Sequence, residues 1–155
     1  MQTNRLSTRS WFLLLVIVLV SLWIPLASLA QDKPEKSLYQ RLGGYDAIAA
    51  VIDNFVGRLV KDPQFTRFFS GFSTDSIKRV RQHIVDQVCS ATGGPCYYTG
   101  RSMKTAHAGL GITGNDWEAS AKHLVATLDQ FKVPEKEKEE LLKIVTSLKG
   151  DIVEK

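Results

Sequence analysis

One histidine stands out as a side chain that could coordinate a metal. His107 lies in the stretch from Gly93 to Ile112, which reads GGPCYYTGRSMKTAHAGLGI. A loop rich in Gly, Pro and Tyr precedes it and further glycines follow, so we expect the histidine on a short helical turn. A neutral imidazole held on such a turn can donate a ring nitrogen to a metal, including the iron of a haem. Taken alone, a histidine beside a loop is more often an ordinary structural residue.

The elements that must position His107 are predicted to be helices. Apolar residues recur at three- and four-residue spacing, and no alternation typical of strands is present, so the fold class is all-α. Gly43-Gly44 should reverse the chain after a short first helix, and Asp62-Pro63 should end the second. After the first helix, three helices are expected over residues 45–60, 75–91 and 103–108. A further helix should begin at 113–116, with Thr113 or Asn115 as its cap, and Pro134 should open the last one. The charged run from Glu135 to Lys143 is expected to be a solvated helix face.

Two separated motifs resemble the group 1 truncated haemoglobins. GGPCYYTGRSMKTAHAGLGI resembles the segment that carries the family's proximal histidine, and SLYQRLGGYDAIAAVIDNFVGRLVKDPQFTRFFSG resembles its first helices. The resemblance runs from about Ser37 to the C-terminus. It implies a truncated globin domain over residues 38–155, a two-over-two helical sandwich around haem b. His107 would then coordinate the iron, and a backbone carbonyl would hold its other ring N–H.

The resemblance also implies which residues line the haem pocket and what the pocket binds. The residues expected to contact the cofactor are Phe55, Val56, Phe69, Val80, His83, Ile84, Val88, Met103 and His107. The expected ligand is a diatomic gas, namely oxygen, nitric oxide or carbon monoxide, and an electron donor is a further expected partner. The family hosts several activities on one fold, so the sequence does not decide whether the chain is an enzyme.

On the ligand side of the expected pocket the chain departs from the family. Val56 stands where the family usually has a tyrosine whose hydroxyl bonds the bound gas. Val80 and Ile84 stand where the family often adds a glutamine, if the helix contains no gap. A hydrogen bond to partly anionic oxygen is strong for its size, so its loss should weaken oxygen binding more than carbon monoxide binding.

His83 leaves two alternatives open. It matches a position where some cyanobacterial members carry a distal histidine that ligates iron, which would make the chain a bis-histidyl electron-transfer protein using His83 and His107. It also fits a histidine at the solvent edge of a charged helix, beside Arg81 and Gln82. Gln87 is a further polar candidate. A third alternative is a helical interaction module without haem.

The N-terminal residues differ from the rest of the chain. Residues 1–10 contain two arginines and no acid, residues 11–30 are almost continuously apolar, and Gln31 begins a polar stretch. This pattern predicts a signal peptide over residues 1–30, with small residues at Ser28 and Ala30 for cleavage and Pro25 just before them. Residues 31–37 would be a flexible leader, and the globin domain would be exported, to the periplasm. The alternative is an uncleaved membrane anchor with the globin domain outside the cytoplasm.

Charge and cysteine content narrow the function classes. The formal net charge of +4 falls to +2 when Arg5 and Arg9 are removed with the first thirty residues, which gives no case for nucleic acid binding. Cys89 and Cys96 lie outside any C-x-x-C-H motif, so covalent c-type haem attachment is not indicated. In an oxidising compartment the two cysteines could form a disulfide, and two thiols are the equal alternative.

Overall fold

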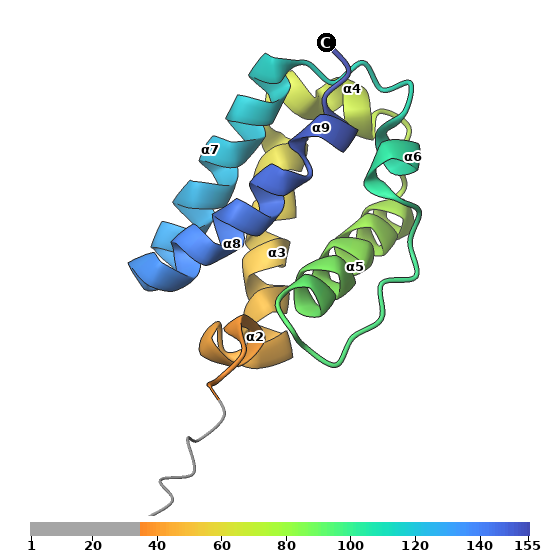
Figure 1. Cartoon of the computed structure of the whole chain (residues 1–155). Helices are drawn as coiled ribbons and strands as arrows, with labels where there is room; N and C mark the ends of the chain where they lie inside the picture. Colours follow the sequence, from red (N-terminus) through yellow and green to blue (C-terminus); the bar gives the residue numbers. More distant parts are fainter. Residues whose placement is uncertain (1–34) are drawn as a thin grey trace, which may run out of the picture. The chain divides into compact units, whose positions relative to one another are not determined.

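The computed structural model describes residues 35–155, and all of the regular secondary structure in this range is helical. This confirms the all-α class. The expectations for residues 1–30 and most of the leader lie outside the described residues. The helices, shown in Figure 1, are α2 (Leu38–Arg41), α3 (Gly44–Lys61), the 3₁₀ turn η1 (Pro63–Phe65), α4 (Thr66–Phe69), α5 (Thr74–Ala91), α6 (Met103–His107), α7 (Gly114–Gln130), α8 (Glu135–Ser147) and α9 (Lys149–Ile152).

Most helix boundaries follow from local sequence signals. Ser37 starts α2 through a capping box with Gln40, and Thr113 starts α7 through a capping box with Asp116. Gly43 adopts a positive φ of 94° between α2 and α3, as expected for the chain reversal. The short α9 was not predicted, because it follows α8 with no breaker between them.

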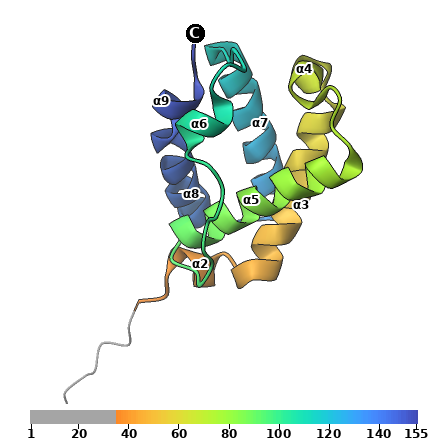
Figure 2. The ribbon, with the colours of Figure 1, turned by 90° about the vertical axis from the view of Figure 1, so that its right-hand side faces the viewer.

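Two apolar clusters hold the long helices together. In the first, Leu124 and Leu128 of α7 pack with Leu141 of α8 and Val51 of α3. In the second, Ile48, Ile52 and Val56 of α3 pack against Val85 of α5. Helices α3 and α5 pack against each other, and α7 and α8 pack through the first cluster, which gives the two layers of the predicted two-over-two sandwich. Figure 2 shows α5 crossing α3.

The charged face of α8 is only partly solvated, which corrects the expectation for residues 135–143. The Arg41 guanidinium of α2 binds the carboxylates of Glu137, at 2.7 Å, and Glu140, and it lowers the pKa of Glu140. The side chain of Glu137 is 12% exposed. These ion pairs tie the first short helix to α8. Among the helices of residues 35–155, none has both the length and the hydropathy needed to cross a bilayer.

Candidate functional site

His107 is the last residue of α6, a helix of five residues. Its half-buried ring bonds through Nδ1 to the carbonyl oxygen of Met103, at 2.8 Å. A carbonyl oxygen can only accept, so Nδ1 carries the hydrogen and the lone pair is on Nε2. The predicted hydrogen bond to a backbone carbonyl is thus confirmed. The arrangement leaves Nε2 as the ring nitrogen that can coordinate a metal.

Of the other predicted residues, the structure brings four apolar ones together. Val56 of α3 is 4% exposed, and Phe55, Ile84 and Val88 pack partly buried against the same cluster. Phe55 and Val88 also pack against the cluster shared by α7 and α8. These four side chains therefore form one connected apolar group, and two of them reach both layers.

Three further predicted apolar residues, Val80, Met103 and Phe69, belong to neither of the two clusters. Val80 is half-buried on α5, and Met103 is half-buried at the start of α6. Phe69, on α4, packs edge-on against Phe72 with ring centroids 6.0 Å apart. Residues 35–155 contain no group of three or more His, Cys, Asp or Glu side chains arranged to hold a metal ion.

His83 is exposed and lies against an aromatic ring from the loop before α6. Its imidazole meets Tyr98 edge-on, with ring centroids 6.1 Å apart. The Tyr98 hydroxyl donates to the Arg101 carbonyl at 2.6 Å, and burial raises the pKa of this tyrosine. The sequence did not indicate this contact, because the two residues belong to different segments and no motif links them.

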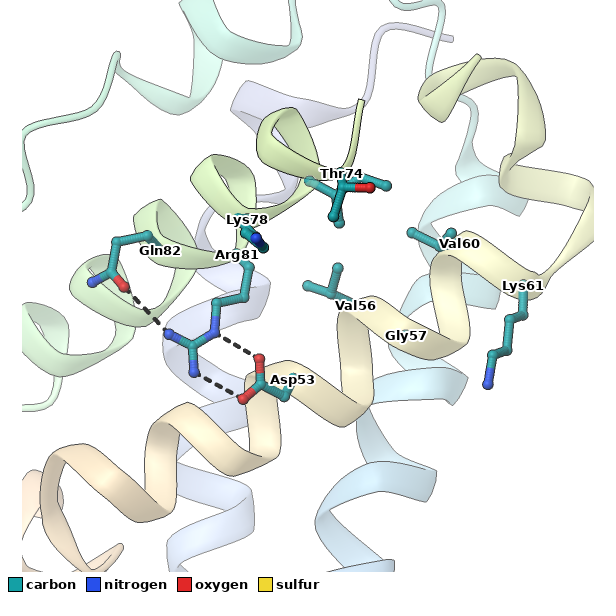
Figure 3. Close-up of a pocket in the computed structure, with 10 residues that line it drawn as sticks. Asp53, Val56, Gly57, Val60, Lys61, Thr74, Lys78, Arg81 and Gln82 are labelled. Atoms are coloured by element: carbon teal, nitrogen blue, oxygen red, sulfur yellow. Dashed lines mark hydrogen bonds and ion pairs between the residues drawn. The ribbon is translucent and has the colours of Figure 1, made fainter. Parts of the chain in front are cut away.

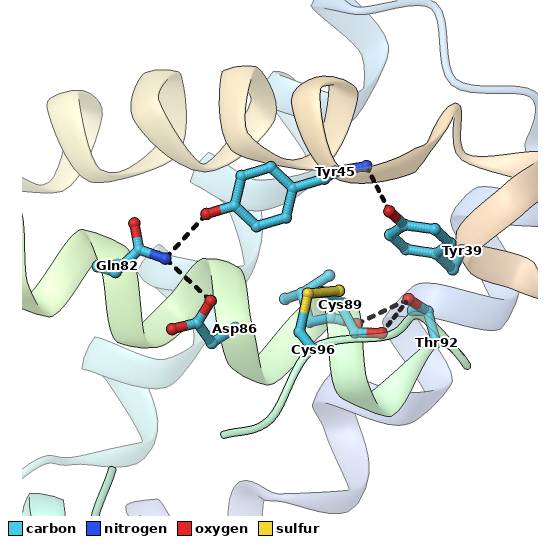
Figure 4. The surroundings of a disulfide bond; sticks show 8 residues. Tyr39, Tyr45, Gln82, Asp86, Cys89, Thr92 and Cys96 are labelled. Atoms are coloured by element: carbon cyan, nitrogen blue, oxygen red, sulfur yellow. Dashed lines mark hydrogen bonds between the residues drawn. A yellow bond between two sulfur atoms is a disulfide. The ribbon is translucent and has the colours of Figure 1, made fainter. Parts of the chain in front are cut away.

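Cys89 and Cys96 form a disulfide, with Cα atoms 5.8 Å apart. The sequence left a disulfide and two free thiols as equal alternatives, and the structure contains the disulfide. Cys89 is fully buried on α5, and Cys96 belongs to the loop that leads to α6, as Figure 4 shows. The bond therefore fastens the segment carrying His107 to the C-terminal end of α5.

A pocket of about 570 Å³ lies between α3 and α5, as Figure 3 shows. Arg81 and Asp53 form a two-bond ion pair at its edge, with N–O distances of 2.7 and 2.8 Å, which lowers the pKa of Asp53. Among the predicted site residues only Val56 lines this pocket. The lining residues are Asp53, Val56, Gly57, Val60, Lys61, Thr74, Ile77, Lys78, Arg81 and Gln82.

His123 has a structural environment. Its Nε2 lies 2.7 Å from the carboxylate of Asp62, which follows α3, and its ring packs edge-on against Phe65. The hydrogen bond from His123 lowers the pKa of Asp62. His107 and His123 therefore differ, since only His123 of the two has a carboxylate partner at Nε2.

The helical sandwich with a lone imidazole on a short helix defines a class of small globins. Residues 37–154 match the bacterial-like globin family, and the chain belongs to this family. The chain is 35% identical to the group 1 truncated haemoglobin of Mycolicibacterium paratuberculosis over 116 residues, covering 75% of this chain and 83% of that protein. It is 34% identical to the group 1 truncated haemoglobin of Nostoc commune over 119 residues, which cover 77% of this chain and 98% of that protein.

Solved structures agree with this assignment. The chain superposes on the Fe(III) form of truncated haemoglobin from Tetrahymena pyriformis with a TM-score of 0.70 at 27% identity. The match covers 77% of this chain and 100% of that one. For the 2/2 haemoglobin of a Synechococcus species, solved with covalently attached haem, the TM-score is 0.68 at 31% identity, with 76% and 98% covered. The predicted family and fold are confirmed.

Proposed function

We propose that this chain binds haem b through His107 and takes up a diatomic gas at the haem iron. The proposal rests on the family and on one observation, the hydrogen bond from Nδ1 of His107 to the Met103 carbonyl, at 2.8 Å. That bond fixes the tautomer in which Nε2 can coordinate. When bound, the haem would supply an iron atom with one position for His107 and one for the gas.

The residues present fit such a group. A haem would bring ring nitrogens of its own as iron ligands, so the protein would need to supply only one imidazole, which His107 would provide. The apolar side chains of Phe55, Val56, Ile84 and Val88 suit a largely hydrophobic porphyrin. These side chains would exclude water from the ligand side, and none of them carries a hydrogen-bond donor.

Replacing His107 with Ala tests the proposal. We expect the variant to lose stable haem binding, whereas His123→Ala should keep it, because His123 is paired with Asp62. Absorption spectra of the ferric, ferrous and carbon monoxide-bound forms provide the measurement. Full haem content and an unchanged ferrous spectrum in His107→Ala would rule out His107 as the ligand. A low-spin six-coordinate spectrum without added ligand, abolished by His83→Leu, would instead support the bis-histidyl alternative.

We further propose that the globin domain is exported after removal of residues 1–30. The charged, apolar and small-residue pattern of that segment supports this, and so does the Cys89–Cys96 disulfide, since disulfides persist in oxidising compartments. The intact mass of protein from an exporting host is expected to lack the first thirty residues. A mass that includes Met1 to Ala30 would favour the membrane anchor.

A further inference from the structure

The carboxylate of Glu154, close to the C-terminus, binds the loop that directly follows His107. Its two oxygens accept hydrogen bonds from the backbone N–H groups of Gly109, at 2.5 Å, and Gly111, at 2.6 Å. Both glycines have positive φ, 80° and 63°, which turns their N–H groups toward one side of the loop. An ionised acceptor strengthens such bonds and makes them directional.

The segment around Glu154 is itself anchored to the same part of the chain. The Glu154 N–H donates to the Ile112 carbonyl at 2.8 Å, and the Gly114 N–H donates to the Lys155 carbonyl at 3.0 Å. The preceding helix, α9, contacts α6, and Figures 1 and 2 both show the two helices side by side. The Glu154 carboxylate therefore belongs to a tail that is held in register with the loop.

Helix α6 needs such contacts because it is too short to hold its own position. A helix of five residues forms few internal hydrogen bonds and is unstable in isolation. At its start, the Ser102 hydroxyl accepts from the Thr105 N–H at 3.2 Å. At its end, the His107 carbonyl accepts from the Leu110 N–H at 3.2 Å, and Leu110 lies between the two glycines that Glu154 binds.

We propose that Glu154 is a positioning residue for His107, which sets the orientation of the imidazole relative to the haem iron. The inference rests on the proposed function, because it assigns Glu154 a role only if His107 coordinates the iron. The carboxylate acts through the backbone: it fixes the loop 109–111, the loop fixes the end of α6, and the end of α6 fixes the ring. A remote acidic residue thus determines the geometry of the proximal ligand.

Glu154→Gln in the full haem-loaded chain tests this role. The substitution keeps the side-chain length but replaces one carboxylate oxygen with an NH₂ donor and removes the charge, so one of the two N–H groups loses the oxygen that it binds in the structure. Resonance Raman spectra of the ferrous, ligand-free protein report the iron–histidine stretching band, which responds to the orientation and bonding of the imidazole. We expect this band to shift or broaden, and haem transfer to a scavenging apoprotein to become about tenfold faster, which corresponds to about 1.4 kcal/mol.

Asp151→Asn is the matched control. Asp151 is an exposed carboxylate in α9, and its side chain makes no hydrogen bond or ion pair with any residue in the range 35–155 that the structure describes. We expect wild-type spectra and haem transfer from this variant. If Glu154→Gln folds poorly, Glu154→Asp, which keeps both oxygens on a shorter side chain, should give a smaller change of the same kind.

The outcomes separate this inference from the proposed function. A wild-type band that depends on His107 and does not change in the Glu154 variants would overturn the role of Glu154 alone. If the variants unfold at a lower temperature while the band stays constant, the role of Glu154 in positioning His107 is also overturned, because the contact would then be purely structural. A wild-type spectrum without any band that depends on His107 would contradict the coordination by His107 itself.

Discussion

The α3–α5 pair and the segment from residue 92 to residue 112 are held in place by different forces. On α3 and α5 the contact is apolar, and Ile52 and Val85 are almost completely buried, with 3% and 0% of their surface exposed. Helix α6, in the second region, contributes no buried residue. That region is fastened by the Cys89–Cys96 disulfide, the Ser102 cap and the Glu154 carboxylate.

This difference separates stability from chemistry within one small domain. Apolar burial in the first region supplies much of the free energy of folding, and each loss of side-chain volume there lowers stability. The second region carries the candidate iron ligand, and a few directional contacts determine its position. Substitutions there should change the properties of the site before they unfold the protein, because regions with few buried contacts open locally at low cost.

Ile52→Ala should have the largest effect on stability. Removing buried methylene and methyl groups from a packed cluster costs transfer free energy and leaves a cavity, so we expect a loss of about 3 kcal/mol in the free energy of unfolding. Urea denaturation monitored by circular dichroism gives the value. Ile52→Val, a smaller deletion at the same position, should cost about 1 kcal/mol. Equal and negligible losses for both variants would contradict tight packing between α3 and α5.

Cys96→Ser tests the covalent contact of the second region. The disulfide closes a short loop, with seven residues of sequence separation, and its removal should cost about 2.5 kcal/mol through the entropy of the unfolded chain. Cys96 is half-buried, so serine is tolerated there better than at fully buried Cys89. We also expect faster haem loss, because the segment leading to α6 is released. Wild-type protein treated with a reductant should match the variant, and a difference between the two would point to an effect of the serine itself.

Much of the first region could be predicted from the sequence. Helical periodicity, the Gly43-Gly44 reversal and the Asp62-Pro63 end gave α3 within a residue or two of its observed bounds. On α5 the sequence did not indicate which apolar residues are buried against the rest of the protein. Val85 and Cys89 are the buried residues, whereas Val80, Ile84 and Val88 are half-buried. Periodicity shows that a helix is amphipathic, but it does not show which of two adjacent apolar stripes packs against the neighbouring helix.

The contacts of the second region could be predicted only in part. The hydrogen bond of His107 follows from the chemistry of a coordinating imidazole, and it was expected. Glu154 lies 45 residues from Gly109, and a lone glutamate near a chain end carries no signal of its partner. The ring of Tyr98 against His83 was missed for the same reason. Polar tethers between distant segments depend on tertiary geometry, which sequence patterns do not encode.

Val56→Tyr examines a residue of the packed region that also belongs to the candidate site. If the new hydroxyl reaches the bound gas, it should slow oxygen dissociation by about 10- to 150-fold, since such a bond is worth roughly 1.5–3 kcal/mol. Carbon monoxide dissociation should change much less. Stopped-flow measurements of both gases provide the test.

Val56→Phe is the matched control for the hydroxyl, because it adds a ring of the same shape without a donor. Both variants should lose some stability, since Val56 is 4% exposed. The pocket of about 570 Å³ that Val56 lines offers the ring another location. Equal oxygen dissociation rates in the two variants would show that the tyrosine hydroxyl does not reach the gas. A large effect of His83→Leu in the wild type would then identify His83 as the residue that contacts it.

Asp116→Asn should have the smallest effect, and it extends the comparison to a polar tether outside the segment 92–112. The Asp116 carboxylate accepts from the N–H of Thr113 at 2.9 Å and from its hydroxyl at 2.7 Å, and it binds the Arg67 guanidinium at 2.5 Å. The bonds from Thr113, followed by those from Gln64 and the charge of Arg67, lower the pKa of Asp116. The ionised group therefore stabilises the folded state.

Because the pKa of Asp116 is lowered on folding, its contribution is fully present above the ordinary aspartate value of about 4 and is lost as the pH falls through the folded pKa. At pH 7 we expect Asp116→Asn to lower the free energy of unfolding by about 1–2 kcal/mol. The gap between wild type and variant should narrow as the pH falls below about 4. Urea denaturation across this range gives both curves, with exposed Asp75→Asn as the control. If the difference in unfolding free energy between wild type and variant stays constant with pH, the substitution acts through packing. The charge of Asp116 then does not hold the start of α7 against Arg67 of α4.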